Sequence, residues 1–215
     1  MKILERSILH NLANAGDTID EIIWVDNGSK KDVHSFMKKI SPDISVLNKE
    51  NTGVARGYNK GFILASGDYI VIPGTDTLLP KNWLKIFKQN AVDGVACMNS
   101  GIELKYLNHD AVGPKIINRM VFDIAGYMRE DFGLYGGDDV EWGERIRSRG
   151  LACVAFPCKF KHMGTEGISR WTKKSNETKE YHDFKFKEAT DTTKAEKHEA
   201  CKKLGYPYYN PFLFG

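Results

Sequence analysis

The chain has 215 residues and is 41% hydrophobic, which suits one sizeable core with a short appendage but not two full domains. Its 31 Lys and Arg residues against 28 Asp and Glu leave a net charge of +3, so the composition gives no reason to expect a nucleic-acid partner. There is no apolar run of the roughly 20 residues that a membrane-spanning helix needs, and the four cysteines lack CxxC or zinc-like spacing, so we expect a cytoplasmic protein with reduced thiols.

The first part of the chain alternates helices with strands. Apolar residues at helical spacing and turn residues at their ends predict helices at 2–12, at about 31–39, and from the glycine-rich turn at 51–61 to about 66–67. Short apolar runs that end in polar loops predict strands at 21–25, 44–47 and 69–72.

The middle of the chain continues this alternation with a change of direction. Pro80 opens a helix, and residues from about 92 to 107 are typical of strands, one of which can be antiparallel. The charged segment 138–149 predicts a helix that ends at Gly150, and 151–156 is the next strand. Strands that alternate with helices and end in polar loops predict an α/β fold with a mostly parallel sheet and ligands at its carboxyl edge.

The composition changes after residue 164 to Lys, Glu and Thr with scattered aromatic residues. We therefore expect a domain at 1–164 and a helical, aromatic extension at 165–215. The extension's aromatic residues and lysines would suit contact with an anionic membrane or a lipid-linked acceptor. Because terminal amphipathic helices more often cover an apolar face of their own domain, we expect helices packed on the core and no membrane contact.

Two polar loops follow the first two predicted strands. Asp26 and Asn27 end the first strand, and taken alone they would form an Asx turn. Residues 51–61 place glycines at the start of a helix, where unpaired backbone N–H groups can approach a phosphate. A purely structural turn explains these glycines equally well, since the segment is neither a Walker motif nor a dinucleotide-binding fingerprint.

Carboxylates stand in two further loops. Asp76 follows the third predicted strand, where a carboxylate either forms a turn or holds a divalent cation that neutralises a departing diphosphate. Asp138 and Asp139 begin the charged helix, and Asp138 with Glu141 has the spacing of a capping box. Asp138 can cap the helix while Asp139 points into a cleft, so the structural and the catalytic interpretations are compatible.

The order and spacing of these four segments resemble the family 2 glycosyltransferases over roughly residues 1–165. The resemblance implies the GT-A type nucleotide-diphospho-sugar transferase fold, with helices flanking a mostly parallel central sheet. It implies transfer of a sugar from a nucleoside diphosphate sugar to a saccharide or lipid-linked acceptor, with inversion and with the help of Mn²⁺ or Mg²⁺. A catalytically impaired nucleotide-sugar binding or scaffold protein of the same fold is the alternative, and the oligomeric state is open.

The resemblance also assigns roles to residues at matching positions. Asp139 is the implied catalytic base, and Asp138 is its acidic neighbour. The implied metal ligands are Asp76 and His162, although a lone histidine is more often a packing or surface residue. The implied donor-binding residues are Asp26, Asn27, Asn51, Gly53, Arg56, Asn59, Thr75 and Asp76.

The chain departs from the family pattern in two places. Gly74 stands where the first Asp of the family's Asp-x-Asp motif is expected, which weakens the case for a metal. Relatives also begin with a strand that forms one wall of the nucleotide pocket, whereas this chain begins with the helix that follows it. Without that neighbour, the strand at 22–25 would expose unpaired backbone groups along one edge. We therefore expect upstream residues, the C-terminal extension or a second subunit to cover that edge, and we favour upstream residues.

Overall fold

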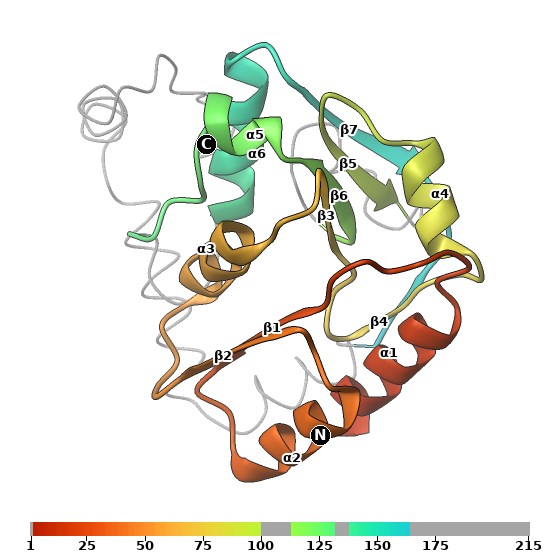
Figure 1. Ribbon diagram of the computed structural model, residues 1–215. Coiled ribbons are helices and arrows are strands. Elements are labelled where there is room, and N and C mark those ends of the chain that lie inside the picture. The colour runs from red at the N-terminus through yellow and green to blue at the C-terminus, as the bar shows by residue number, and fades with distance from the viewer. Residues whose placement is uncertain (1, 100–112, 132–137, 164–215) are drawn as a thin grey trace, which may run out of the picture.

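The computed structural model describes residues 2–99, 113–131 and 138–163 (Figure 1). Its helices are α1 (Lys2–Ala13), α2 (Lys31–Ile40), α3 (Val54–Leu64), α4 (Trp83–Gln89), α5 (Met120–Ile124) and α6 (Asp138–Ser148). Its strands are β1 (Ile23–Asn27), β2 (Ile44–Asn48), β3 (Tyr69–Ile72), β4 (Thr77–Leu78), β5 (Gly94–Asn99), β6 (Lys115–Asn118), β7 (Ala152–Pro157) and β8 (Lys161–His162).

Most of the predicted elements are confirmed with shifts of a few residues at their ends. The helix expected from Pro80 begins at Trp83, and the sequence analysis did not find α5, β6, or the two-residue strands β4 and β8. The second half of the 92–107 region and the extension predicted at 165–215 lie outside the described residues. No helix in the described part of the chain is long and apolar enough to cross a membrane.

A four-stranded sheet in the order β3-β6-β5-β7 forms the centre of the molecule. Strands β5 and β7 are parallel, whereas β6 is antiparallel to both β3 and β5. Three of these four strands therefore share one direction, and the antiparallel strand is β6, which lies outside the region 92–107 where the sequence analysis expected a change of direction. Gly94 allows β5 and β7 to approach closely, because a Cβ atom at this position would lie 1.8 Å from the carbonyl oxygen of Ala152.

Hydrophobic clusters cover both faces of this sheet, as expected for a buried sheet in an α/β fold. On one face, α3, α5 and α6 contribute the packed rings of Phe62, Phe122 and Trp142, with centroids 4.9 to 6.1 Å apart. On the other face, α4 contributes Trp83 and Phe87. Strand β5 is buried along its whole length, and its side chains alternate between the two clusters.

Strands β1 and β2 form a separate parallel pair, which Figure 1 shows below the four-stranded sheet. Helix α3 packs against β1, and on α2 the Phe36 ring meets Trp24 of β1 edge-on at 6.1 Å. Among the described residues, β1 is paired only with β2, and β3 only with β6. The edge of β1 that the sequence analysis expected another segment or subunit to cover has no strand partner within the described residues.

Candidate functional site

The side chain of Asn27, at the end of β1, is the centre of a polar network. Its Nδ2 group donates to Asn51 Oδ1 and to the Gly53 carbonyl oxygen, both at 2.9 Å. Its Oδ1 atom accepts from Asn48 Nδ2 at 3.1 Å and from the backbone N–H and hydroxyl of Thr52 at 3.0 and 2.9 Å. We call these residues the asparagine hub. Because an amide has two N–H groups and two lone pairs, Asn27 has no hydrogen-bonding capacity left over.

The hub also uses the groups that the sequence analysis assigned to the donor at 51–53. The Gly53 N–H donates to Asn51 Oδ1 at 3.0 Å, so it is not available to a phosphate in this structure. Gly53 stands at the N-terminus of α3 with φ of +97°, and a glycine adopts this conformation without strain. The structure thus brings together Asn27, Asn51 and Gly53, which the sequence analysis assigned to one donor site, and in it they bind one another.

Asp26 precedes the hub and is 3% exposed. Its Oδ2 atom accepts from the Ser29 N–H at 2.9 Å and from His34 Nε2, on α2, at 3.0 Å. Burial by itself raises the pKa of the Asp26 carboxyl, but the hydrogen bonds from Ser29 and His34 outweigh burial and hold this pKa below its ordinary value. Asp26 is therefore an ionised carboxylate at neutral pH, held against the turn that follows β1.

Asn59 and Arg56, on α3, connect this helix to residues 128–130. The Asn59 side chain donates to the Met128 carbonyl oxygen at 2.8 Å and accepts from the Met128 N–H at 3.0 Å. It also donates to Glu130 Oε1 at 3.0 Å, and it is 3% exposed. Arg56 Nε lies 3.4 Å from Glu130 Oε2, and both of these side chains are about half exposed. Asn59 is therefore a buried anchor, whereas Arg56 is open to a ligand.

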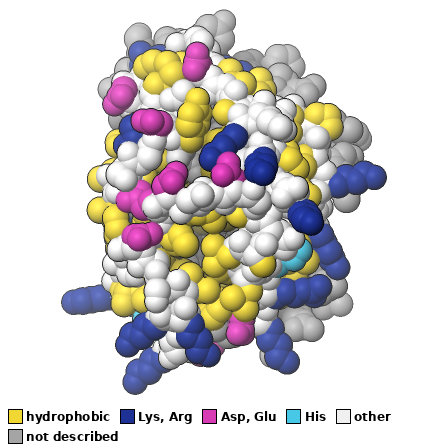
Figure 2. Space-filling view, turned by 45° about the vertical axis from the view of Figure 1, so that its right-hand side comes forward, with side chains coloured by type: hydrophobic (Ala, Val, Ile, Leu, Met, Phe, Trp, Pro, Cys, Tyr) yellow, Lys and Arg dark blue, Asp and Glu magenta, His cyan; other side chains and the backbone are white. Residues whose placement is uncertain are grey.

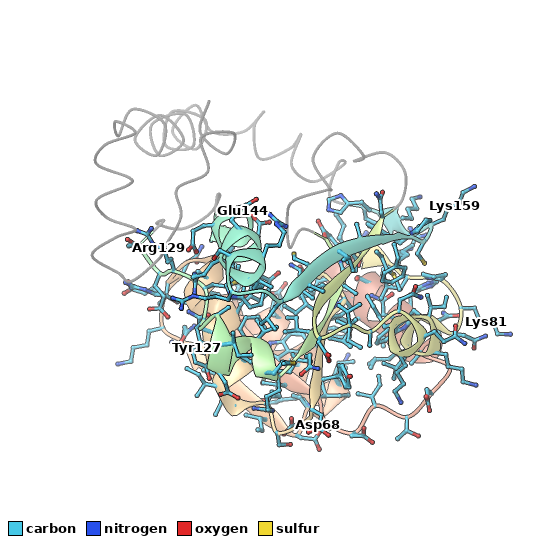
Figure 3. All side chains as sticks on the ribbon, turned by 90° about the horizontal axis from the view of Figure 1, so that it is seen from above. Asp68, Lys81, Tyr127, Arg129, Glu144 and Lys159 are labelled. Atoms are coloured by element: carbon cyan, nitrogen blue, oxygen red, sulfur yellow. The ribbon has the colours of Figure 1, made fainter. Side chains whose placement is uncertain are left out.

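Helix α6 holds the preceding part of the same segment. Arg145, 4% exposed, makes a bidentate pair with Glu141 at 2.8 Å and donates to the carbonyl oxygens of Ala125 and Tyr127 at 2.5 and 2.8 Å. Figure 3 shows Tyr127 and Arg129 on the same side of the molecule as Glu144 of α6, away from Lys81 and Lys159. Segment 125–130 is thus tied to α6 at one end and to α3 at the other.

The two aspartates at the start of α6 differ in burial. Asp138 is 5% exposed, whereas Asp139 is partly exposed. Both carboxylate oxygens of Glu141, the other residue of the expected capping box, accept from Arg145. Of the two aspartates, Asp139 is the one that a small molecule could reach.

The structure brings Asp76 and His162 together, although they are far apart in the sequence. Strand β4 pairs with β8 in antiparallel register, and the Met163 N–H donates to the Asp76 carbonyl oxygen at 2.6 Å. His162 Nε2 then lies 3.4 Å from Asp76 Oδ2, and the two side chains are 39% and 33% exposed. Thr75, beside Asp76, is exposed. The described residues contain no group of three or more potential metal ligands, so among them this pair is what a cation here would meet.

Helix α1 holds the loop that carries Asp76, and the sequence analysis did not anticipate this role. The Ser7 hydroxyl and the Asn11 amide donate to the Thr77 carbonyl oxygen at 2.6 and 3.1 Å. Asn11 also accepts from the Leu79 N–H at 2.9 Å. Ser7 and Asn11 are almost fully buried, whereas Leu9 of the same helix is 50% exposed. Two small polar residues four positions apart were the only signal in the sequence for this contact.

Charged side chains of both signs lie on the face shown in Figure 2. Asp and Glu side chains gather mainly at the upper left of this face, and Lys and Arg side chains lie mainly toward its lower and right-hand parts. This face therefore carries no single continuous basic surface of the kind that binds a nucleic-acid backbone.

A family model described as glycosyl transferase family 2 matches residues 2–132. Among solved structures, the chain is similar to the mannosyltransferase PcManGT from Pyrobaculum calidifontis in complex with GDP-Man and Mn²⁺, with 19% identity and a TM-score of 0.59 over 73% of this chain and 51% of that one. It is also similar to GalNAc-T7 with UDP, GalNAc and Mn²⁺, with 13% identity and a TM-score of 0.56 over 74% of this chain and 41% of that one. The third is TarS 1–349 from S. aureus, with 15% identity and a TM-score of 0.55 over 78% of this chain and 60% of that one.

The chain thus spans about half the length of these three proteins. At such low identity, the similarity shows a shared fold and no more. The comparison with curated proteins gives no significant match.

Proposed function

We propose that this chain, which belongs to glycosyl transferase family 2 and has the GT-A fold, transfers a sugar from a nucleoside diphosphate sugar to an acceptor hydroxyl. The observation that carries the proposal is the Asp76–His162 pair, whose side-chain atoms lie 3.4 Å apart and whose side chains are both partly exposed. A carboxylate in the turn before β4 and an imidazole on β8, which the pairing of these strands holds together and which are partly open to solvent, are suited to a ligand. The structures of similar fold with GDP-Man or UDP bound support a nucleoside diphosphate as that ligand.

The donor nucleotide would lie between the end of β1 and α3. The ionised Asp26 is suited to accept hydrogen bonds from the N–H groups of a base or the hydroxyls of a ribose, while the asparagine hub shapes the adjoining wall. Arg56 extends from the first turn of α3 and is paired with Glu130 only through a long, exposed contact. An exposed ion pair of this kind is weak, so a diphosphate could replace Glu130 as the partner of the guanidinium at little cost in free energy.

Asp76 and His162 would hold Mn²⁺ or Mg²⁺ in the presence of the donor. Oxygen and imidazole nitrogen are suitable donors for these ions, and phosphate oxygens would complete a shell in which the protein supplies two ligands. When bound, the cation would neutralise charge on the leaving diphosphate. Because a pair of ligands is a poor site by itself, we expect the free protein to bind the cation weakly.

Asp139 is the proposed base. It would accept the proton of the acceptor hydroxyl while that oxygen forms its bond to the anomeric carbon, and the diphosphate would leave from the opposite side with the bonding electrons. The configuration of the sugar would therefore be inverted. The partial exposure of Asp139 beside the buried Asp138 supports this assignment.

The test is release of nucleoside diphosphate by the purified chain from a panel of UDP and GDP sugars, with saccharide and lipid-linked acceptors. We expect release that an acceptor stimulates and that EDTA lowers. Binding of donors without turnover under any condition would instead favour an impaired nucleotide-sugar binding protein. A chain that binds neither UDP nor GDP, with or without Mn²⁺, would contradict the proposal.

A further inference from the structure

Lys115, the first residue of β6, is a buried cation that none of the roles above uses. The residue is 4% exposed. Its register partners are Ile72 of β3 and Cys97 of β5, and residues paired in this way point to the same face of a sheet. The ammonium nitrogen lies 5.8 Å from the ring centroid of Tyr58, on α3. Its surroundings are therefore apolar, apart from one aromatic face.

The Lys115 ammonium makes no hydrogen bond or ion pair with any residue in the described ranges. In the described ranges, Arg147 Nη1 is the buried side-chain nitrogen without a hydrogen-bond partner, so the Lys115 ammonium, at the end of a largely buried side chain, keeps some access to solvent. Its three donors can therefore reach a ligand. Arg145 is equally buried but has Glu141 and two carbonyl oxygens as partners. Within the described ranges, Lys115 therefore lacks the anionic partner that a buried cation ordinarily has.

The position of Lys115 indicates where that anion would come from. Because β6 is antiparallel to its neighbours, its first residue lies at the carboxyl ends of β3 and β5. Ile72 is the last residue of β3 and is followed by the loop that carries Asp76. Tyr58 lies two residues after Arg56 on α3. The ammonium is thus at the sheet edge between the two groups of proposed donor-binding residues.

We infer that Lys115 binds the diphosphate of the donor and supplies part of the charge neutralisation there. Asp76 is the one carboxylate of the loop at 73–76, so the loop adds little negative charge to oppose a direct contact between the ammonium and phosphate. Because a protein cation at this place neutralises part of the diphosphate charge, the nucleotide keeps part of its affinity when no metal is bound. This inference rests on the proposed function and adds to it a residue that contacts the ligand.

The test is calorimetric titration of the whole chain with UDP and GDP, in Mn²⁺ and in EDTA, for the wild type and Lys115→Met. Loss of one charge-assisted contact should weaken nucleoside diphosphate binding by about 10- to 100-fold, and most clearly in EDTA. Binding of uridine and guanosine, which have no phosphate, should not change. The melting temperature without ligand should stay the same or rise, because the variant removes a buried charge. Lys85→Met, on the exposed face of α4, is the matched control and should behave as the wild type.

Three outcomes contradict the inference, and they are distinguishable. If Lys115→Met binds UDP and GDP as the wild type does, the inference is wrong and the proposed function stands. If the variant loses affinity for nucleosides and nucleotides equally and also melts earlier, Lys115 is a structural residue. If the wild type binds neither UDP nor GDP, the proposed function itself fails. Lys115→Gln, which is neutral but polar, replaces the methionine variant should that variant not fold.

Discussion

The asparagine hub at the end of β1 and the Asp76–His162 pair, which lies in the turn before β4 and on β8, use their polar groups in opposite ways. In the hub, the N–H groups and the oxygen of the Asn27 amide are all hydrogen-bonded to residues 48–53. In the pair, the two side chains meet each other at 3.4 Å, and each keeps a third or more of its surface exposed. A polar group that is satisfied inside the protein stabilises the fold, whereas one that is still open can bind a ligand.

This difference divides the proposed site residues into two groups. Asn27 and Asn51, in the hub, and Asn59, on α3, form the first group, because their amides bind other parts of the chain. Asp76, Asp139, His162, Arg56 and Thr75 are at least partly exposed. We therefore expect substitutions in the first group to lower stability and substitutions in the second to lower activity.

The largest effect is expected for Asp139→Asn. Loss of a general base should lower turnover by about 100- to 10,000-fold, while donor affinity and melting temperature stay near the wild type. Turnover is measured with the natural acceptor, and donor affinity is measured by calorimetry with UDP and GDP. Asp123→Asn, at an exposed position on α5, is the control and should be fully active. Near-normal turnover in Asp139→Asn would exclude it as the base.

A smaller loss is expected for Asp76→Asn. Without this carboxylate, turnover in Mn²⁺ should fall by about 100-fold, because the departing diphosphate loses charge stabilisation. His162→Ala should act in the same direction, and the double variant should add little, since the two side chains would serve one ion. Asp68→Asn, at an exposed turn before β3, should leave activity unchanged. Unchanged dependence of the rate on Mn²⁺ concentration in Asp76→Asn would contradict the assignment.

Asn27→Ala should reverse this pattern and lower stability more than activity per folded molecule. Its partners at 48–53 would lose hydrogen bonds in a half-buried place, which we expect to cost about 2 kcal/mol of unfolding free energy. For a chain of this size, the melting temperature should then fall by roughly 4–8 °C. Asn51→Ala, which removes fewer hydrogen bonds, should cost less. Were Asn27→Ala as stable as the wild type, the hub would not be the framework that its hydrogen bonds indicate.

The smallest effect is a pH dependence that Asp26 contributes to stability. Because the pKa of Asp26 is lower in the folded protein than its ordinary value of about 3.9, its contribution is fully present above that value and is lost as the pH falls through the folded pKa. Asp26→Asn should therefore be less stable than the wild type at pH 7 by about 1 kcal/mol, and the difference should shrink below about pH 4. Melting temperatures between pH 2 and 7 measure this. A difference that does not change with pH would show that the charge of Asp26 is not involved.

Local patterns in the sequence were enough for most of the secondary structure and for the family. The strand predicted at 69–72 and the helix predicted from Asp138 both match, because a short buried strand and a helix with acidic residues in its first turn have strong local signals. The pairing of Asp76 with His162 followed from the resemblance. Strand β8, which brings them together, is two residues long and has no signal of its own.

The sequence alone determined the order of the longer helices and of strands β1, β2, β3, β5 and β7, since apolar periodicity and turn residues act over a few positions. Only the tertiary structure decided which polar residues are anchors and which are open, because that depends on partners elsewhere in the chain. The Asn59 side chain is hydrogen-bonded to the backbone of Met128. Ser7 and Asn11 are buried against the loop that carries Asp76. Lys115 is an ordinary lysine in the sequence, and it becomes a candidate ligand-binding residue only because β3, β5 and α3 enclose it in apolar surroundings.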